Sequence, residues 1–123
     1  MTRRAAARAA ATSPRSDCPI ACTLDLIGDR WTLLIVRDLM LGKCRFSEFL
    51  ASGEGVTTSI LAARLKRLEL AKLVERSRYQ EHPPRSEYHL TQAGQKLAPV
   101  LKAMLVWGSE RVFVGRGAAA DKR

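Results

Sequence analysis

The sequence predicts a mainly α-helical domain that carries one small β-hairpin. Apolar residues recur with helical spacing over most of residues 19–114. Two short segments, residues 73–79 and 86–90, instead have strand character and flank a linker with two prolines. The chain has 123 residues, 46% of them hydrophobic, which is enough for one domain with a core of its own.

Two helices are expected at the start of this domain. Pro19 suits a first helical turn, and the first helix is expected to end at Gly28. Asp29 can then cap a second, mostly apolar helix that runs to Gly42. A helix with so few polar residues is expected to lie centrally in the core.

Two further helices precede the strands. A short third helix around residues 46–50 is broken by the Ser-Gly-Glu-Gly sequence at 52–55. Thr57 or Thr58 is expected to cap a fourth helix that runs to about Ala71. Its predicted core stripe consists of Leu61, Leu65 and Leu68.

The hairpin and the last helix complete the domain. Residues 80–85 contain Pro83 and Pro84, which lack the N–H donors of a central strand, so this linker is predicted to form a stiff, basic hairpin tip. Thr91 is expected to cap one last helix over residues 92–114. The domain boundaries are then a basic arm at 1–16, the folded domain at 17–114 and a tail at 115–123.

The charge balance favours a polyanionic partner. The chain carries 21 Lys and Arg against 12 Asp and Glu, a net charge of +9. Such an excess favours nucleic acid first and an anionic membrane surface second, although it also fits a protein that is merely basic. No apolar run approaches the ~18 residues of a membrane-spanning helix, so we expect no membrane partner.

The order of elements predicts a winged helix-turn-helix. Two helices joined by a short turn and followed by a two-stranded wing have this arrangement, and the second helix of the pair enters the major groove of DNA. The fourth helix fits that role because the outward-facing side chains are small in its first half, which lets the backbone approach the groove, and basic in its second half. The alternative is an ordinary amphipathic surface helix. The candidate DNA-binding residues are Lys43, Arg45, Thr57, Thr58, Ser59, Ala62, Ala63, Arg64, Lys66, Arg67, Arg78, His82 and Arg85.

The wing supplies part of this set. The two prolines hold Arg85 outward, where it can enter a narrow, electronegative minor groove. Arg76, Arg78 and His82 could meet the DNA backbone. The alternative is that these charged side chains only face solvent, and we favour this interpretation for Arg76 taken by itself.

The same residues resemble a known family, the HxlR-type regulators, a winged-helix branch close to the MarR family. The resemblance covers about residues 18–112. The matching segments are 18–20, 28–35, 45–49, Leu61, 65–69, 73–74, Tyr79, 83–84, 87–88, 90–91, Gly94 and 107–108. Two positions depart from the family: Lys72 stands where Gly is usual, and Thr58-Ser59 where longer polar or basic side chains are common.

The resemblance implies a homodimeric transcription regulator of the bacterial cytoplasm, associated with the nucleoid. Independently, the last helix carries more apolar surface than a small domain is expected to cover, and such patches mark interfaces. Internal packing of all these residues is the alternative. Family members dimerise through their first and last helices, so the candidate interface residues are Ile20, Leu24, Val100, Met104, Trp107 and Val112. A two-fold dimer places two recognition helices about one DNA turn apart on a palindromic operator.

The three cysteines are an odd number, which argues against a disulfide framework and for a reducing cytosol. A position at a helix start favours the reactive thiolate, and the family includes members that sense oxidants or electrophiles at the position of Cys18. Cys18 is therefore the redox-sensing candidate, ahead of Cys22 and Cys44. The alternative for each is a small buried hydrophobe. A Cys-x3-Cys spacing without a nearby His lacks four ligands, so we predict no metal site.

Motifs of catalysis are missing from the sequence. Its two histidines, His82 and His89, lie in or beside the wing, and there is no Gly-rich phosphate loop, GxSxG or HExxH. We therefore expect no enzyme activity and no cofactor, and no residue pattern demands a small-molecule effector. The expected function is sequence-specific binding of double-stranded DNA, through which the protein represses transcription. The alternative is a winged-helix adaptor for proteins that binds no specific DNA.

Overall fold

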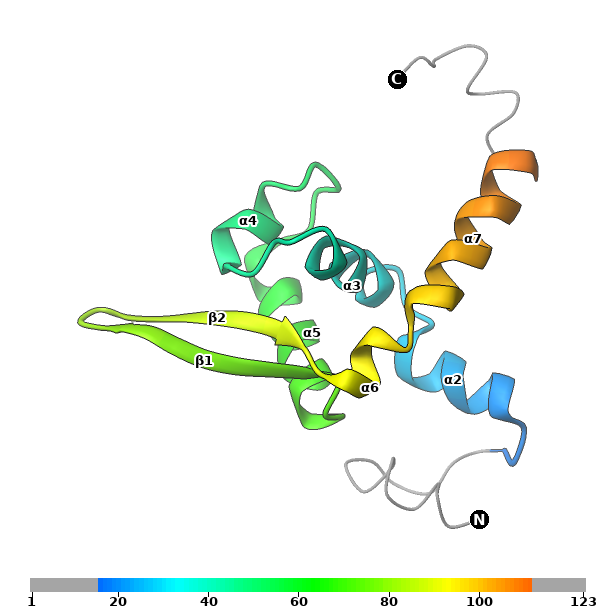
Figure 1. The fold of residues 1–123 in the computed structure, drawn as a ribbon, viewed down its shortest axis with the longest axis horizontal. Coiled ribbons are helices and arrows are strands. Elements are labelled where there is room, and N and C mark those ends of the chain that lie inside the picture. The colour runs from blue at the N-terminus through cyan, green and yellow to red at the C-terminus, as the bar shows by residue number, and fades with distance from the viewer. Residues whose placement is uncertain (1–15, 112–123) are drawn as a thin grey trace.

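The computed structural model describes residues 16–111. The hairpin projects from one end of the molecule, and α2 and α7 extend from the opposite end (Figure 1). Its elements are, in chain order, α2 (Pro19–Ile27), α3 (Thr32–Met40), α4 (Phe46–Leu50), α5 (Thr58–Leu70), β1 (Val74–Glu81), β2 (Pro84–Leu90), α6 (Gln92–Gln95) and α7 (Ala98–Arg111). The described part of the chain thus has the predicted mainly α-helical fold with one two-stranded antiparallel hairpin.

The core lies where α3, α4 and α5 meet the base of the hairpin. The predicted stripe of α5 is buried, because Leu61, Leu65 and Leu68 lie on one helical face. The other buried apolar residues of the cluster are Ile35, Val36, Leu39, Phe49 and Val74. The Phe49 ring also meets the Tyr88 ring edge-on, with 6.4 Å between centroids, which ties the wing to the core.

Side-chain caps fix where three helices begin. The Asp29 carboxylate accepts hydrogen bonds from the main-chain N–H groups of Trp31 and Thr32, at 3.0 and 3.1 Å, so it serves the first turn of α3. The Thr57 and Thr91 hydroxyls each accept a hydrogen bond from the N–H three residues later. These three predicted caps are confirmed.

The last helix is not continuous, and the prediction of one helix over residues 92–114 is wrong. The structure has α6 and then α7, with a break at residues 96–97. Pro99 explains the break, because its ring would clash with the carbonyl four residues earlier in an unbroken helix, whereas the first turn of a new helix tolerates proline. The candidate interface residue Val112 lies outside the described residues. None of the described helices is long and apolar enough to cross a membrane.

The hairpin is longer than predicted. Residues 80–85 were expected to be linker, but the strands pair out to Glu81 opposite Pro84, and only His82 and Pro83 turn the chain. A two-stranded sheet has only edge strands, so Pro84 can begin β2 without breaking a ladder. The register shifts between Arg78 and Gln80, before the strands reach the tip.

Lys72, at the position where the resemblance leads us to expect glycine, closes the end of α5. Lys72 has a φ of 64°, in the left-handed region. The N–H of Lys72 donates to the Glu69 carbonyl and that of Leu73 to the Leu68 carbonyl, both at 3.0 Å. This pair of bonds closes the helix and turns the chain into β1.

Candidate nucleic-acid interface

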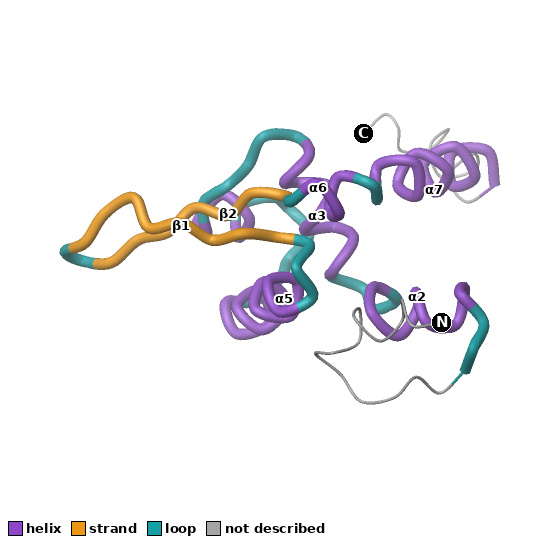
Figure 2. The backbone as a smooth tube through the Cα atoms, turned by 60° about the horizontal axis from the view of Figure 1, so that its bottom comes forward, coloured by secondary structure: helices purple, strands orange, loops and turns teal. Residues whose placement is uncertain are grey.

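The outer face of α5 is exposed. Its residues lie opposite the three buried leucines, and α5 runs beside the base of the hairpin (Figure 2). The side chains on this face are small over the first two turns, and a lysine follows in the next turn. On α5 and at its cap, the exposed members of the predicted set are Thr57, Thr58, Ser59, Ala62, Ala63 and Lys66.

Arg64 and Arg67, also predicted to bind DNA, both reach Asp29. Arg64 Nε lies 2.8 Å from Asp29 Oδ2, and Arg67 Nη1 lies 3.8 Å from Asp29 Oδ1. Arg67 Nη2 also donates to the main-chain carbonyl of Asp25 at 2.7 Å. These two arginines therefore brace α5 against the end of α2 and the connection that follows it, 35 or more residues earlier in the chain.

Asp29 is held in its charged form by this arrangement. Partial burial alone would raise its pKa. Hydrogen bonds from the Thr32 hydroxyl, from Arg64 and from the two main-chain N–H groups outweigh that effect and hold the pKa of Asp29 well below its ordinary value. The carboxylate is thus both a helix cap and the ionic partner of α5.

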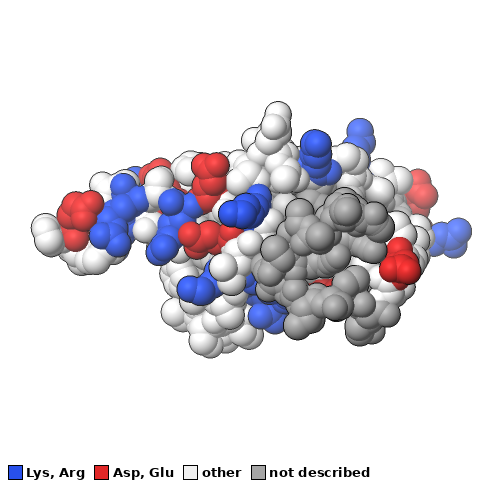
Figure 3. All heavy atoms as spheres, turned by 90° about the horizontal axis from the view of Figure 1, so that it is seen from below, with Lys and Arg blue, Asp and Glu red and all other residues white. Residues whose placement is uncertain are grey.

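The wing carries mixed charges, with arginines interspersed among glutamates along the hairpin (Figure 3). Arg78 Nη1 lies 3.3 Å from Glu81 Oε1, and Arg76 Nε lies 3.6 Å from Glu69 Oε2. His82 and Arg85 are exposed at the tip. Within residues 16–111, neither Arg85 nor Lys66 forms an ion pair, so both cations are available to a ligand.

Arg45, which precedes α4, is held by contacts with both strands of the wing. Its Nη2 and Nε lie 3.0 and 3.2 Å from Glu87 Oε2, and its guanidinium carbon lies 4.0 Å from the centroid of the Tyr79 ring. The other residue predicted on this loop, Lys43, is 3.9 Å from Asp38 Oδ1. Sequence reasoning named Arg45 but missed Tyr79 and Glu87, because they lie on strands far along the chain.

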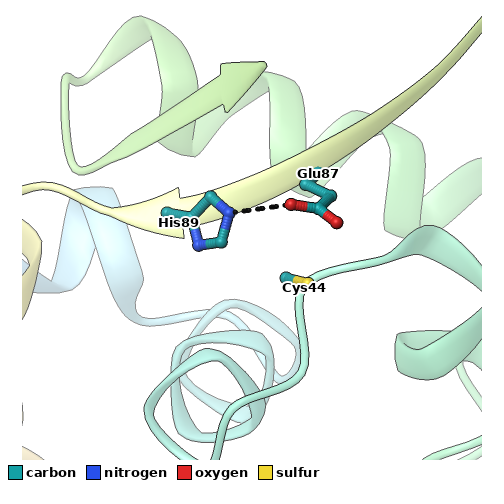
Figure 4. A group of neighbouring side chains, drawn as sticks. All are labelled: Cys44, Glu87 and His89. Carbon is teal, nitrogen blue, oxygen red and sulfur yellow. Dashed lines mark hydrogen bonds and ion pairs between the residues drawn. The ribbon is translucent and has the colours of Figure 1, made fainter. Parts of the chain in front are cut away.

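Three side chains that can bind a metal ion, those of Cys44, Glu87 and His89, lie close together (Figure 4), and Glu87 is also the partner of Arg45. Cys44 comes from the loop between α3 and α4, whereas Glu87 and His89 come from β2. Burial, followed by the charges of Glu87 and Glu48, raises the pKa of the Cys44 thiol. Hydrogen bonds from Arg45 and then His89 lower the pKa of Glu87. The sequence analysis missed this group, and its only signal was the alternation of Glu87 and His89 on one face of a strand.

The two helices at the far end of the molecule expose apolar side chains. On α2, Ile20 and Leu24 are exposed, and on α7 Val100, Met104 and Trp107 are exposed. Cys18 precedes α2 and is exposed with a free thiol, whereas the Cys22 thiol donates to the Ser16 carbonyl at 3.1 Å.

The described fold matches known proteins along most of its length. Residues 26–114 match the HxlR-like helix-turn-helix family. They include α3, the helix-turn-helix pair α4 and α5, and the wing formed by β1 and β2. The chain belongs to this family. The chain is similar to the uncharacterized HTH-type transcriptional regulator sll1512 of Synechocystis sp., with 40% identity over 93 residues, 76% of this chain and 69% of that protein.

Solved structures support the same assignment for this HxlR-like chain. The redox regulator HypR in its oxidized form has a TM-score of 0.70 and 36% identity, with 76% of this chain and 97% of that chain covered. The reduced form of the transcriptional regulator YodB from B. subtilis has a TM-score of 0.65 and 35% identity, with coverages of 79% and 96%. This HxlR-like protein is therefore a transcriptional regulator with a winged helix-turn-helix DNA-binding fold, and its relatives are regulators rather than enzymes.

Proposed function

We propose that this regulator binds specific double-stranded DNA as a homodimer on a palindromic operator and acts as a repressor, on the nucleoid in the bacterial cytoplasm. The single observation that carries the proposal is the outer face of α5. It is exposed, it is built of small and hydroxyl side chains, and its lysine has no ionic partner among the described residues.

The chemistry of this face fits a major groove. Ala62 and Ala63 let the helix backbone approach closely in a groove about 12 Å wide. Thr58 and Ser59 can exchange hydrogen bonds with base edges at the start of the helix, and Lys66 can reach bases or phosphates further along. We assign Arg64 and Arg67 to holding α5 against Asp29, with their exposed parts left for phosphate contacts.

Two other segments extend the surface. Arg85 and His82 at the wing tip are placed to enter the flanking minor groove, where A/T-rich sequence is narrow and electronegative. Arg45 presents its guanidinium to the backbone while Tyr79 and Glu87 hold it in one orientation, so little side-chain entropy is lost on binding. Arg78 and Lys43 add phosphate contacts at the rims.

The exposed apolar faces of α2 and α7 support the dimer. Both helices extend from the end opposite the wing (Figure 1), so pairing there leaves both copies of α5 free to meet DNA. The two-fold axis that relates the copies would be matched by a palindromic operator.

The experiment is a fluorescence anisotropy titration with a duplex selected from a random pool. Lys66→Ala is expected to lose about 1–3 kcal/mol of binding free energy if the lysine reads bases. Arg85→Ala should weaken binding mainly at A/T-rich flanks. Lys102→Ala removes an exposed lysine of α7 and serves as the matched control. Unchanged affinity in the Lys66→Ala/Arg85→Ala double variant would contradict this docking.

The salt dependence of the same titration separates DNA binding from the adaptor alternative. Each phosphate contact should contribute a slope of about −0.9 to the plot of log affinity against log salt concentration. A winged-helix adaptor for proteins would show no preference for the selected duplex and a shallow slope.

We further propose that Cys18 switches this binding when it is oxidised or modified by electrophiles. Its thiol is free and exposed at the start of α2, and the structurally similar HypR is a redox regulator. Diamide, which is reduced to the hydrazine as it joins the Cys18 thiol to a second cysteine thiol of the dimer in a disulfide, is expected to change operator affinity in the native chain and not in Cys18→Ser. Identical responses of the two proteins would exclude Cys18 as the sensor.

A further inference from the structure

The loop after α3 and strand β2 bring together a thiol, a carboxylate and an imidazole. The Cys44 sulfur, a Glu87 carboxylate oxygen and a His89 ring nitrogen all lie within 4.8 Å of one another. Figure 4 shows the three side chains converging between the loop and the strand. This group lies outside the exposed face of α5, and of its three side chains the proposed DNA contacts use only Glu87, through its pair with Arg45.

The backbone fixes the three positions relative to one another. The Tyr88 N–H donates to the Cys44 carbonyl at 2.8 Å, and Arg45 forms an antiparallel bridge with Glu87. Glu87 and His89 are alternate residues of β2, so both project from the same face of the strand toward Cys44.

The two carboxylate oxygens of Glu87 face different partners. Oε1 lies 3.3 Å from His89 Nε2, whereas Oε2 accepts both hydrogen bonds from Arg45. A cation bound at Oε1 would therefore leave the pair between Glu87 and Arg45 in place. Arg45 would act as an outer partner that orients the carboxylate.

We propose that Cys44, Glu87 and His89 bind a divalent transition-metal ion of the zinc class. Thiolate, imidazole and carboxylate are the three protein ligands of zinc, whereas Mg²⁺ and Ca²⁺ select oxygen alone. Zinc bonds of about 2.0–2.3 Å place tetrahedral ligand atoms about 3.3–3.8 Å apart, so the group closes by about 1 Å on binding. The exposed His89 can turn to make this adjustment.

The charge of the ion suits its surroundings. On binding, the Cys44 thiol gives its proton to the solvent, and the thiolate and the Glu87 carboxylate together balance the two positive charges. Cys44 and His89 also line a pocket of about 490 Å³ together with Leu39, Met40 and Tyr88. The fourth coordination position can therefore open into this pocket and hold a water molecule. The ion would join the loop before α4 to the wing.

The test is a Co²⁺ titration of the full-length reduced protein, read by the thiolate-to-cobalt charge-transfer absorption. We expect one Co²⁺ per chain and displacement of Co²⁺ by Zn²⁺. Cys44→Ser should abolish the charge-transfer band. His89→Ala, at an exposed position that the fold does not need, should weaken Zn²⁺ binding about tenfold or more in a competition with a chelating dye.

Matched variants separate this site from other ligands in the chain. The Cys18→Ser/Cys22→Ser double variant and His82→Ala, which removes the other histidine of the hairpin, should both bind as the native protein does. The proposal is overturned if the band survives in Cys44→Ser, if it disappears in the double variant, or if His89→Ala binds Zn²⁺ as tightly as the native protein. None of these readouts involves DNA, so the result is independent of the proposed operator binding.

Discussion

At the scale of single residues, Asp29 shows how one carboxylate serves two elements. It accepts the N–H groups that begin α3 and pairs with Arg64 of α5. Asp29→Asn keeps the size of the side chain but removes its charge. We expect the variant to lose about 1–2 kcal/mol of unfolding free energy at pH 7, measured by urea denaturation.

The pH dependence of that loss follows from the direction of the pKa shift. The pKa of Asp29 in the folded protein is below its unfolded value of about 3.9. Its charge therefore stabilises the fold fully above about pH 5, and this contribution is lost as the pH falls through the folded pKa. The difference between native protein and Asp29→Asn should be constant near neutrality and shrink below about pH 4. Glu110→Gln, at an exposed position of α7, should show no comparable difference at any pH.

The residue scale also shows which site features the sequence could predict. Exposure of Thr58, Ser59 and Lys66 followed from helical spacing alone, because burial of the leucine stripe turns the opposite face outward. The ionic partners of Arg64 and Arg45 did not follow from helical spacing, since Asp29 is 35 residues from Arg64 and Glu87 is 42 residues from Arg45 in the sequence. Spacing along one helix carries no information about which distant side chain packs beside it.

At the scale of elements, the helix starts were predictable because a capping side chain acts within three residues. The break between α6 and α7 was equally local, and Pro99 was its signal. The length of the hairpin was a different case. Proline has no N–H to donate, so it can lie in a strand only where its nitrogen faces away from a neighbouring strand. The number of strands in the sheet decides whether such a position exists.

The end of α5 yields a prediction at this scale. Lys72 occupies a left-handed conformation that costs a residue with a side chain about 1 kcal/mol relative to glycine. Lys72→Gly should therefore raise the unfolding free energy by about 0.5–1 kcal/mol, because the bonds that close the helix are all main-chain bonds. Lys72→Ala keeps the strained φ and should leave the stability within about 0.5 kcal/mol of the native value. Equal stabilities of the glycine and alanine variants, measured by urea denaturation, would contradict the argument.

At the scale of the whole molecule, the ends of the described structure differ in chemistry. The wing end carries interspersed charges (Figure 3), and the opposite end (Figure 1) carries the exposed apolar side chains of α2 and α7. Charged groups keep a surface hydrated, whereas an apolar patch gains free energy when it is covered. This division gives the proposed dimer and the proposed DNA contacts separate surfaces, so a substitution in one surface leaves the residues of the other in place.

Leu24 and Leu41 provide a matched pair for testing the dimer. Leu24 on α2 is 59% exposed, and Leu41, which follows α3 and belongs to neither helix of the proposed interface, is 70% exposed. Leu24→Glu would bury a charge in that interface and should convert the protein to a monomer in light scattering and sedimentation. Leu41→Glu introduces the same charge and should leave the dimer intact.

Dissociation should also weaken operator binding, because a single chain contacts one half-site and loses the gain in effective concentration that a linked second half-site provides. A Leu24→Glu variant that stays dimeric, or a native protein that is monomeric at micromolar concentration, would contradict the assignment of this face.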